Sequence, residues 1–453
     1  MEFSIEVRPM AFQSRNDEVG AILAGIVRCQ KQGTPRALYG ACSAHPYAIR
    51  AVLQQAHKDG TPALIESTAG QVNPFDGYTG LTPEQFRRQV LQMAAALGLC
   101  PDRVILGGDH VGPYPWRHED ASRALAKAAA LARACVAAGY RKIHLDTSVS
   151  CNDDSGPNGG GLPLEVISRR TAELCRHTEH MARAVGSPPP WYVIGSDVPA
   201  PGGGGRAANT APVTEVQHLE GFLAACRRAL DDAGLPDVWQ RVFGVVVCTG
   251  ADFSPSRIQP YDRARMQPLV ASIRREKQLV LEAHSTDFQH PAALARMVVD
   301  HCGILKVGPA LTYAMREALF ALADIETQTL GGRSGVLCSN LPAVMDRLMV
   351  ADPRFWRFYY GGSEAALVRL RRQAYSDRIR YYWSRPEAVA AVQRLIANLR
   401  EYPPPVSLIR EHLPETGAKI RDGRLVNDPE SILGDRIGEV TSIYARACRP
   451  LAS

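Results

Sequence analysis

The sequence lacks the features that mark membrane, secreted and disulfide-stabilised proteins. No apolar run reaches the roughly 20 residues that a membrane span needs, and the first residues, MEFSIEVRPM, show no basic region followed by an apolar one. The 11 cysteines are scattered without a CxxC pair, which is typical of reduced thiols. We therefore expect a cytoplasmic protein with no membrane partner.

Nucleotide and nucleic-acid motifs are also missing. The chain has no Gly-x-x-x-x-Gly-Lys-Ser/Thr loop of the kind that cradles nucleotide phosphates. The turn after the first predicted strand reads Ser43-Ala44-His45-Pro46, without the Gly-rich fingerprint of dinucleotide-binding sheets. A net charge of +6 is mild for 453 residues, and only the stretch 369–380 is locally basic. We expect no nucleic-acid partner.

What the chain does contain is a repeated alternation of short apolar runs, polar tips and helical stretches. Alternating units of this kind predict a parallel sheet. Eight of them predict a closed (β/α)₈ TIM barrel, with an open doubly wound sheet as the alternative. The runs occupy residues 37–41, 63–65, 104–106, 143–145, 192–195, 243–247, 279–281 and 304–307.

Two further segments flank this pattern. An amphipathic helix is expected at 19–31, before the first strand. Beyond about residue 328 the pattern becomes helical and rich in aromatic residues. We therefore predict a barrel with an N-terminal helix over 1–328 and an α-helical C-terminal extension over 329–453.

Ionisable residues gather at the predicted carboxyl ends of the strands, where the active site of such a barrel lies. The stretch RVILGGDHVG ends a buried strand in Asp109 and His110, after two glycines that permit close backbone approach. Buried charges are costly unless they are paired or bound to a metal. The number of polar and ionisable residues at one rim of the barrel therefore indicates an active site there. The strand ends carry Ser43, His45, Glu66, Asp109, His110, Asp146, Asp197, Glu282 and His284.

Histidines and carboxylates together suit a divalent cation, most simply Zn²⁺. We predict His110 and His284 as ligands, and the third ligand is Asp197, Glu282 or Glu66. Glu282 and His284 lie two apart on a strand and so face the same way, which suits either ligation or orientation of the histidine. An ion pair inside the barrel is the alternative for each carboxylate.

A phosphate group is expected near the loops after the seventh and eighth strands, because a helix N-terminus there attracts anions. The loops carry Ser285, Thr286 and Gly308, with a helix over 313–322 following. Arginines of the extension would add positive charge, although plain surface arginines are an equal alternative. The predicted substrate- or phosphate-binding set is Ser43, His45, Ser285, Thr286, Gly308, Arg378 and Arg380.

Several segments together resemble the GatZ/KbaZ family, known as the non-catalytic subunit of class II tagatose-bisphosphate aldolase. The resemblance implies a class II aldolase-like barrel and a link to galactitol or tagatose catabolism, and some relatives are similar to metal-dependent 4-epimerases. The matching segments lie at 42–46, 65–80, 105–113, 142–151, 192–203, 282–288, 305–322 and 376–383.

The resemblance also implies roles for particular residues. An Asp-His pair at one strand end supplies the acid/base and a metal ligand in class II aldolases, and these roles fall on Asp109 and His110. The late histidine ligand corresponds to His284. The remaining aldolase histidine has no evident match, because the sixth strand here ends in Cys248-Thr249-Gly250. That departure disfavours ordinary aldolase activity.

Two functions follow as hypotheses. The first is a metal-dependent C4 epimerase of a ketohexose phosphate (tagatose 6-phosphate and fructose 6-phosphate), working by retro-aldol cleavage and re-addition. In it Asp109 is the general base, and Asp146 or Glu66 orients the substrate hydroxyls. The alternative is a non-catalytic subunit that stabilises a separate class II aldolase. The expected partners are a phosphorylated ketohexose, a catalytic aldolase subunit in the second case, and further copies of the chain in a homo-oligomer.

Overall fold

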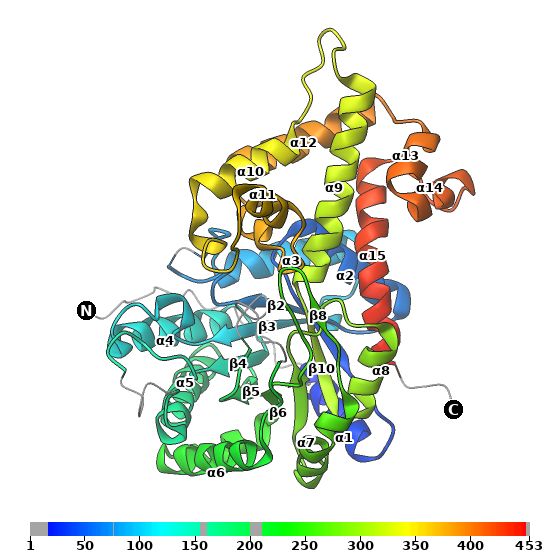
Figure 1. Cartoon of the computed structure of the whole chain (residues 1–453). Coiled ribbons are helices and arrows are strands. Elements are labelled where there is room, and N and C mark those ends of the chain that lie inside the picture. Colours follow the sequence, from blue (N-terminus) through cyan, green and yellow to red (C-terminus); the bar gives the residue numbers. More distant parts are fainter. Residues whose placement is uncertain (1–16, 76, 155–160, 200–210, 450–453) are drawn as a thin grey trace.

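Figure 1 shows the computed structural model, which describes residues 17–75, 77–154, 161–199 and 211–449. Eight parallel strands close into a barrel, and this confirms the predicted (β/α)₈ fold. Around the barrel the strands run β1 (Leu38–Cys42), β2 (Ala63–Thr68), β3 (Val104–Val111), β4 (Lys142–Asp146), β5 (Trp191–Gly195), β6 (Val242–Val247), β9 (Val280–Ala283) and β10 (Cys302–Val307).

Helices follow the strands and cover the outside of the barrel. At the start of α3, Thr82 and Gln85 form a capping box, each side chain accepting from the other's backbone N–H. A two-stranded antiparallel sheet, β7 (Asp252–Phe253) and β8 (Ile258–Gln259), interrupts the alternation after β6. The outer helices are α2 (Pro46–Asp59), α3 (Pro83–Ala96), α4 (Ala121–Ala137), α5 (Leu164–Ala184), α6 (Val216–Asp232), α7 (Arg263–Arg275), α8 (Pro291–Val299) and α9 (Pro309–Leu330).

Helix α1 (Glu18–Lys31) closes the amino-terminal end of the barrel. Its apolar residues Leu23, Ile26 and Val27 are buried in one cluster with apolar side chains of six strands. The helix begins at Asp17, whose carboxylate accepts from the Gly20 backbone N–H at 2.8 Å. The amino-terminal end of the barrel is therefore closed by apolar side chains. The opposite end, formed by the carboxyl ends of the strands, is the one where a ligand can enter.

The C-terminal part of the described chain is helical, with α10 (Leu341–Ala351), α11 (Glu364–Gln373), α12 (Pro386–Glu401), α13 (Val406–His412), α14 (Pro414–Arg421) and α15 (Pro429–Cys448). In Figure 1, α9 runs up from the barrel, and α15 lies beside it and packs on α2 and α8. Helix α9 continues through residue 328, and the division of the chain at that point stays a prediction.

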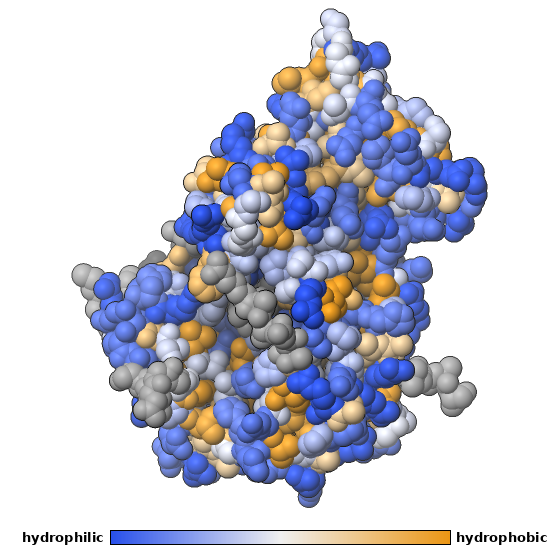
Figure 2. Space-filling model, in the orientation of Figure 1, coloured by the Kyte–Doolittle hydropathy of each residue, from blue (hydrophilic) through white to orange (hydrophobic). Residues whose placement is uncertain are grey.

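Large apolar side chains are exposed in the extension. Figure 2 shows apolar patches among hydrophilic ones over both the upper, helical part of the molecule and the barrel below it. Among the described residues, the exposed large hydrophobic side chains all follow residue 330: Leu337, Val350, Phe358, Val389 and Val426.

Homo-oligomerisation stays a prediction. Within the described ranges, no helix combines the length and the apolar character that a membrane crossing requires.

Candidate active site

The side chains that point into the barrel form three layers, because alternate residues of a strand face the same side. Next to α1 lies the apolar layer, with Leu64, Ile105 and Ile304. Nearer the carboxyl ends of the strands lies a charged set from β2, β4, β9 and β10, here called the ionic layer: Glu66, Lys142, Glu282 and Lys306. At the mouth lies the histidine layer: Asp109, His110, His144 and His284.

The ionic layer is a closed network of opposite charges. Lys142 Nζ lies 2.6 Å from Glu66 Oε1 and 2.5 Å from Glu282 Oε2, and all three side chains are fully buried. Lys306 contacts the other oxygen of Glu66 and reaches up to Asp109 Oδ1 at 2.7 Å. A Cβ on Gly107 would lie 2.8 Å from Cγ of Glu66, so the first glycine of the GGDH stretch makes room for this carboxylate.

A local distortion of β3 brings His110 to the mouth beside Asp109. Adjacent residues of a regular strand face opposite sides, but His110 has φ +47° and the β3–β4 register shifts between Gly108 and Val111. A Cβ on Gly112 would overlap the backbone carbonyl of Asp146, so glycine is required just after the bulge. The strained backbone places both side chains of the Asp-His pair at the same opening.

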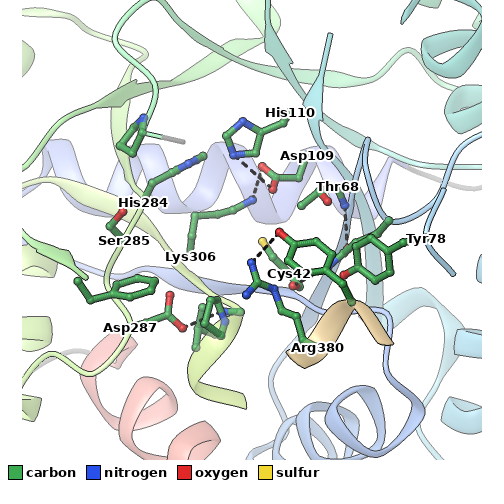
Figure 3. Close-up of a pocket in the computed structure, with 17 residues that line it drawn as sticks. Cys42, Thr68, Tyr78, Asp109, His110, His284, Ser285, Asp287, Lys306 and Arg380 are labelled. Atoms are coloured by element: carbon green, nitrogen blue, oxygen red, sulfur yellow. Dashed lines mark hydrogen bonds and ion pairs between the residues drawn. The ribbon is translucent and has the colours of Figure 1, made fainter. Parts of the chain in front are cut away.

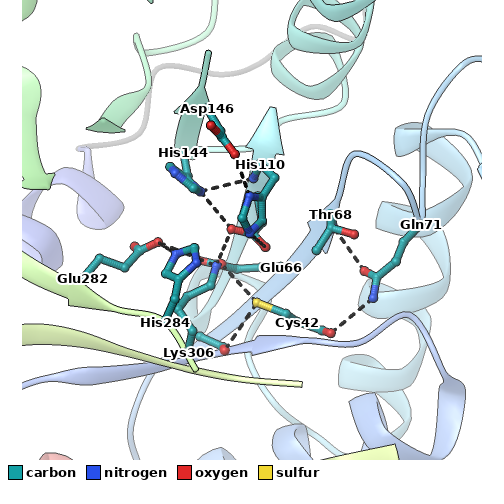
Figure 4. Close-up of polar contacts among 12 residues, drawn as sticks. Cys42, Glu66, Thr68, Gln71, His110, His144, Asp146, Glu282, His284 and Lys306 are labelled. Carbon is teal, nitrogen blue, oxygen red and sulfur yellow. Dashed lines mark hydrogen bonds and ion pairs between the residues drawn. The ribbon is translucent and has the colours of Figure 1, made fainter. Parts of the chain in front are cut away.

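The three imidazoles of the histidine layer surround one point (Figure 4). Their ring centroids are 5.0, 5.0 and 5.1 Å apart in the three pairs formed by His110, His144 and His284. Each ring has a carboxylate on one nitrogen, a partnership that fixes the tautomer and the orientation of metal-bound histidines. The contacts are His110 Nδ1 to Asp146 Oδ2 at 2.9 Å, His144 Nδ1 to Asp109 Oδ1 at 3.0 Å and His284 Nε2 to Glu282 Oε1 at 3.1 Å.

The electrostatics differ within the layer. Burial favours a higher pKa for Asp109, but His110, His144 and His284 outweigh it and hold the pKa of this carboxyl well below its usual range. Burial lowers the pKa of His110, yet Asp109 and Asp146 reverse this and raise it. For His284 burial dominates and lowers the pKa, which favours the neutral ring that a metal requires.

The residues present fit a divalent cation. One ligand atom from each of Asp109, His110, His144 and His284 lies within 4.8 Å of the others, and all four residues are buried. Nε2 of His144 is buried and has no hydrogen-bond partner, although buried polar atoms rarely lack one. His144 Nδ1 lies 3.0 Å from Asp109 Oδ1 and 3.2 Å from the backbone nitrogen of His110, and the tautomer that donates from Nδ1 to Asp109 is the one that leaves the Nε2 lone pair for a metal. Three imidazoles suit Zn²⁺ with a further position open to substrate.

His144 is the residue that sequence reasoning missed. It lies inside the apolar run 143–145 rather than at a strand end, and only residues at strand ends were predicted as site residues. The available signal was the alternation of Lys142, His144 and Asp146 along β4, which gives three polar residues one common face. This strand supplies the third histidine that the sixth strand, ending before Cys248, does not.

The three candidates for the third ligand lie elsewhere. Asp197 accepts from Thr214 Oγ1 at 2.5 Å and from Cys248 Sγ at 3.4 Å, and it is outside the histidine group. Glu66 lies one layer below, between two lysines, and forms a second group of possible ligands with Cys42 and Asp109, so its role as a ligand stays a prediction. Glu282 spans the layers, pairing with Lys142 and with the ring of His284. It is thus arranged as an orienting carboxylate rather than as a member of the cluster.

Asp146, expected to orient substrate, instead contacts His110. Its other oxygen accepts from the Ser148 hydroxyl at 2.7 Å and from the Ser148 backbone N–H at 3.2 Å. The side chain is buried and does not line the pocket. Its contacts can hold the His110 ring but do not reach into the cavity.

A pocket opens over the histidine layer (Figure 3). Asp109, His110, His284 and Lys306 form its floor. The walls come from the loops after β1, β2, β9 and β10 and from the extension, with Cys42, Thr68, Gln71, Tyr78, Ser285, Asp287, Gly308, Arg380 and Tyr381. Thr68, Tyr78, His110 and Tyr381 also border a neighbouring groove, here called the arginine groove, which Arg378 lines. The extension therefore completes the site that the barrel begins.

The loops after the seventh and eighth strands, which were predicted to bind phosphate, match that prediction only in part. Ser285 and Gly308 line the pocket, but Thr286 donates to the backbone carbonyl of Lys306 at 2.5 Å and does not. The N-terminus of α9 is capped by Asp287, whose Oδ1 accepts from the backbone N–H of Gly308 at 3.0 Å and of Ala310 at 2.8 Å. A carboxylate thus holds the place where a phosphate was expected. Burial raises the pKa of Asp287 to about 6.

The two arginines of the extension are buried side chains rather than surface ones. Arg378 is 2% exposed and donates from Nη1 to the Phe355 carbonyl at 3.0 Å, while its Nε and Nη2 have no hydrogen-bond partner. Arg380 donates to the backbone carbonyls of Ser376 and Asp377 and, at 2.9 Å, to the Tyr381 hydroxyl. Arg380 thus has acceptors for three of its N–H groups, whereas Nε and Nη2 of Arg378 have none and its guanidinium lies over the ring of Tyr359.

Ser43 and His45 border an adjacent cavity rather than the pocket over the histidines. His45 caps α2 by accepting from the Tyr47 backbone N–H at 3.3 Å, and Ser43 accepts from the His45 backbone N–H at the same distance. Burial lowers the pKa of His45 to about 4, so its ring is neutral. These contacts give both side chains structural roles at the start of the helix.

Comparison with known proteins agrees with this architecture. A crystal structure of a probable tagatose 6 phosphate kinase from Sinorhizobium meliloti 1021 is similar at 36% identity and a TM-score of 0.82, covering 91% of this chain and 100% of that one. The YdjI aldolase of Escherichia coli K12 is 14% identical with a TM-score of 0.40, covering 67% of this chain and 86% of the other. A fructose-bisphosphate aldolase of Campylobacter jejuni is 14% identical with a TM-score of 0.43, covering 87% and 95%. These last two likenesses are too distant to bear on function.

The family comparison covers almost the whole chain. The model of the D-tagatose-1,6-bisphosphate aldolase subunit GatZ/KbaZ-like family matches residues 23–449. This range includes all eight strands of the barrel, the histidine layer and the short 3₁₀ helix Arg378–Tyr382 that carries both arginines. The chain belongs to the GatZ/KbaZ-like family of D-tagatose-1,6-bisphosphate aldolase subunits.

Proposed function

We propose that this protein is a divalent-metal-dependent C4 epimerase of a ketohexose phosphate, with tagatose 6-phosphate and fructose 6-phosphate as its substrate pair. The observation that carries the proposal is the buried group of three imidazoles and one aspartate at the barrel mouth, with Nε2 of His144 unpartnered. A metal ion bound to that nitrogen would supply the partner that it lacks. The family, and a Sinorhizobium relative described as a probable tagatose 6 phosphate kinase, agree with a tagatose phosphate as ligand.

The metal site in this proposal consists of His110, His144 and His284. A bound cation supplies Lewis-acid stabilisation of negative charge on the sugar oxygens. Asp146 and Glu282 hold two of the rings from behind, and Asp109 holds the third. Zn²⁺ is the simplest assignment for three imidazoles.

Asp109 is the general base. Lys306 and His144 both contact its Oδ1, at 2.7 and 3.0 Å, so the carboxylate is kept ionised and fixed in orientation at the pocket floor. It takes the proton from the C4 hydroxyl as the C3–C4 bond breaks, which separates two three-carbon halves. Rotation of the C4 aldehyde presents its other face, the bond re-forms, and Asp109 returns the proton to the C4 oxygen.

The phosphate of the substrate is proposed to bind in the arginine groove. Arg378 is buried there with two donor nitrogens that lack partners, and the groove shares His110 with the pocket over the histidine layer. Guanidinium groups bind phosphate through paired N–H donors, which suits Nε and Nη2 of one side chain. The distal end of the sugar would thus be anchored while C3 and C4 lie over the histidine layer.

The test is an NMR assay of tagatose 6-phosphate with the purified, zinc-supplemented chain alone. We expect conversion to fructose 6-phosphate, loss of turnover in His144→Ala, and wild-type turnover in His177→Ala, which alters a histidine on the outside of α5. No turnover by the wild-type chain, together with increased stability or activity of a class II aldolase when the chain is added, would instead establish the non-catalytic subunit.

A further inference from the structure

The N-terminus of α9 is an anion site that the chain fills with its own carboxylate. The loop after the eighth strand of such barrels commonly binds phosphate through backbone N–H groups at a helix N-terminus. Here the N–H groups of Gly308 and Ala310 both donate to Asp287 Oδ1, at 3.0 and 2.8 Å. Asp287 is 3% exposed and stands at the head of a 22-residue helix. The contacts that a phosphate would make are already taken.

This occupied site lies on one side of the histidine layer, and the arginine groove lies on another. Asp287, Ser285 and Gly308 line the pocket together with His284, and Figure 3 shows Asp287 below His284 and Ser285. The arginine groove reaches the same layer through His110. A linear sugar lying across the histidines would therefore meet a carboxylate at one end and an unsatisfied guanidinium at the other.

We propose that the pocket selects ketohexoses with a single phosphate, whose C1 end is a free hydroxymethyl group facing Asp287, and that it rejects ketohexose 1,6-bisphosphates. The inference rests on the proposed epimerase function and specifies its substrate class. A C1 hydroxyl can donate to the carboxylate, whereas a C1 phosphate would bring a second anion against it. The two anions would also compete for the same pair of backbone donors.

Arg380 does not restore an anion site at this end. It lines the same pocket, and its charge favours the ionised form of Asp287. Three of its five N–H donors, however, are committed to the Ser376 and Asp377 carbonyls and to the Tyr381 hydroxyl. Donors that are already paired add little to phosphate binding, because the existing hydrogen bonds must first be broken.

The proposal is tested by calorimetric titration of the zinc-loaded wild-type chain with fructose 6-phosphate and, separately, with fructose 1,6-bisphosphate. We expect the 6-phosphate to bind about tenfold or more tightly than the bisphosphate. Asp287→Gly frees the two N–H groups and should raise the affinity for the bisphosphate about tenfold, while the affinity for the 6-phosphate should fall because its C1 hydroxyl loses the carboxylate as acceptor.

Asp287→Asn is the second variant, because its amide oxygen can still cap α9 if the glycine variant fails to fold. It removes the charge but keeps the volume and the acceptor, so bisphosphate binding should improve less than in Asp287→Gly. Equal affinities of the wild-type chain for the two sugars, or no gain in either variant, would overturn the inference while leaving the proposed function intact. If neither sugar binds the wild-type chain, the proposed function is wrong and the inference falls with it.

Discussion

The ionic layer and the histidine layer lie one above the other inside the same barrel, and both are almost wholly buried, yet they are built on different principles. In the ionic layer each charge contacts an opposite one, as Lys142 does between Glu66 and Glu282. In the histidine layer each imidazole has a carboxylate within hydrogen-bond distance of one nitrogen, and Nε2 of His144 has no hydrogen-bond partner. The charges of the first layer are balanced by opposite charges of the protein, whereas the second layer presents an imidazole nitrogen to a ligand.

The largest difference between the two layers is expected when the proposed general base, Asp109, is changed in the histidine layer. Asp109→Asn keeps the shape of the side chain but not its charge, and we expect the epimerisation rate to fall about 10²- to 10⁴-fold with the metal still bound. NMR turnover at saturating substrate measures the rate, and metal analysis of the same sample checks the site. A variant that keeps more than about a tenth of the wild-type rate would remove Asp109 from the role of base.

The ionic layer should respond in stability. Lys142→Met leaves Glu66 and Glu282 facing each other with one lysine fewer, and breaking a buried ion pair costs about 3–5 kcal/mol. Urea unfolding followed by circular dichroism measures the loss. The matched control is Lys127→Met, because Lys127 pairs with Glu119 at 2.5 Å but its side chain is 27% exposed. We expect at most about 1 kcal/mol there, and similar losses in both variants would contradict the distinction.

A carboxylate behind the histidine layer should affect the metal rather than the fold. Asp146→Asn weakens the contact that orients His110, so the metal dissociation constant should rise about 10- to 100-fold. Competition with a chromophoric chelator measures this constant. Unchanged zinc affinity in this variant would mean that Asp146 does not support a metal ligand.

The smallest effect concerns the space that the ionic layer occupies. Gly107→Ala places a methyl group 2.8 Å from Glu66 Cγ, and the overpacking should cost about 1–3 kcal/mol. Gly25→Ala is the control, because Gly25 lies in α1 and a Cβ there meets only the flexible end of Arg28. That change should stabilise the protein by about 0.5–1 kcal/mol in thermal unfolding. Two changes of the same sign would contradict the packing argument.

Most of the fold could be predicted from the sequence, because each barrel strand is a short apolar run and most helices carry their own start and stop signals. The capping box at Thr82 and the left-handed Gly98 after α3 are local features that tertiary packing has no reason to override. The small β7–β8 sheet was not predicted, since two-residue strands leave no periodic pattern to detect.

The candidate site could be predicted only in part. His110 and His284 follow apolar runs, and a parallel barrel brings such tips together. His144 was missed because it lies within a run. The bulge that turns His110 inward depends on the β3–β4 register, which is a tertiary property. The capping of α9 by Asp287 joins two loops that lie about 20 residues apart, and no local pattern indicates it.

The central claim is that the histidine layer is a metal site and that His144 completes it. The most direct measurement is the zinc content of the purified wild-type chain and of His144→Ala by inductively coupled plasma mass spectrometry, after dialysis against trace zinc. We predict about one zinc per wild-type chain and a large loss in the variant, with the metal-free forms unfolding at similar temperatures. Equal zinc content in the two proteins, or none in the wild-type chain, would contradict the account.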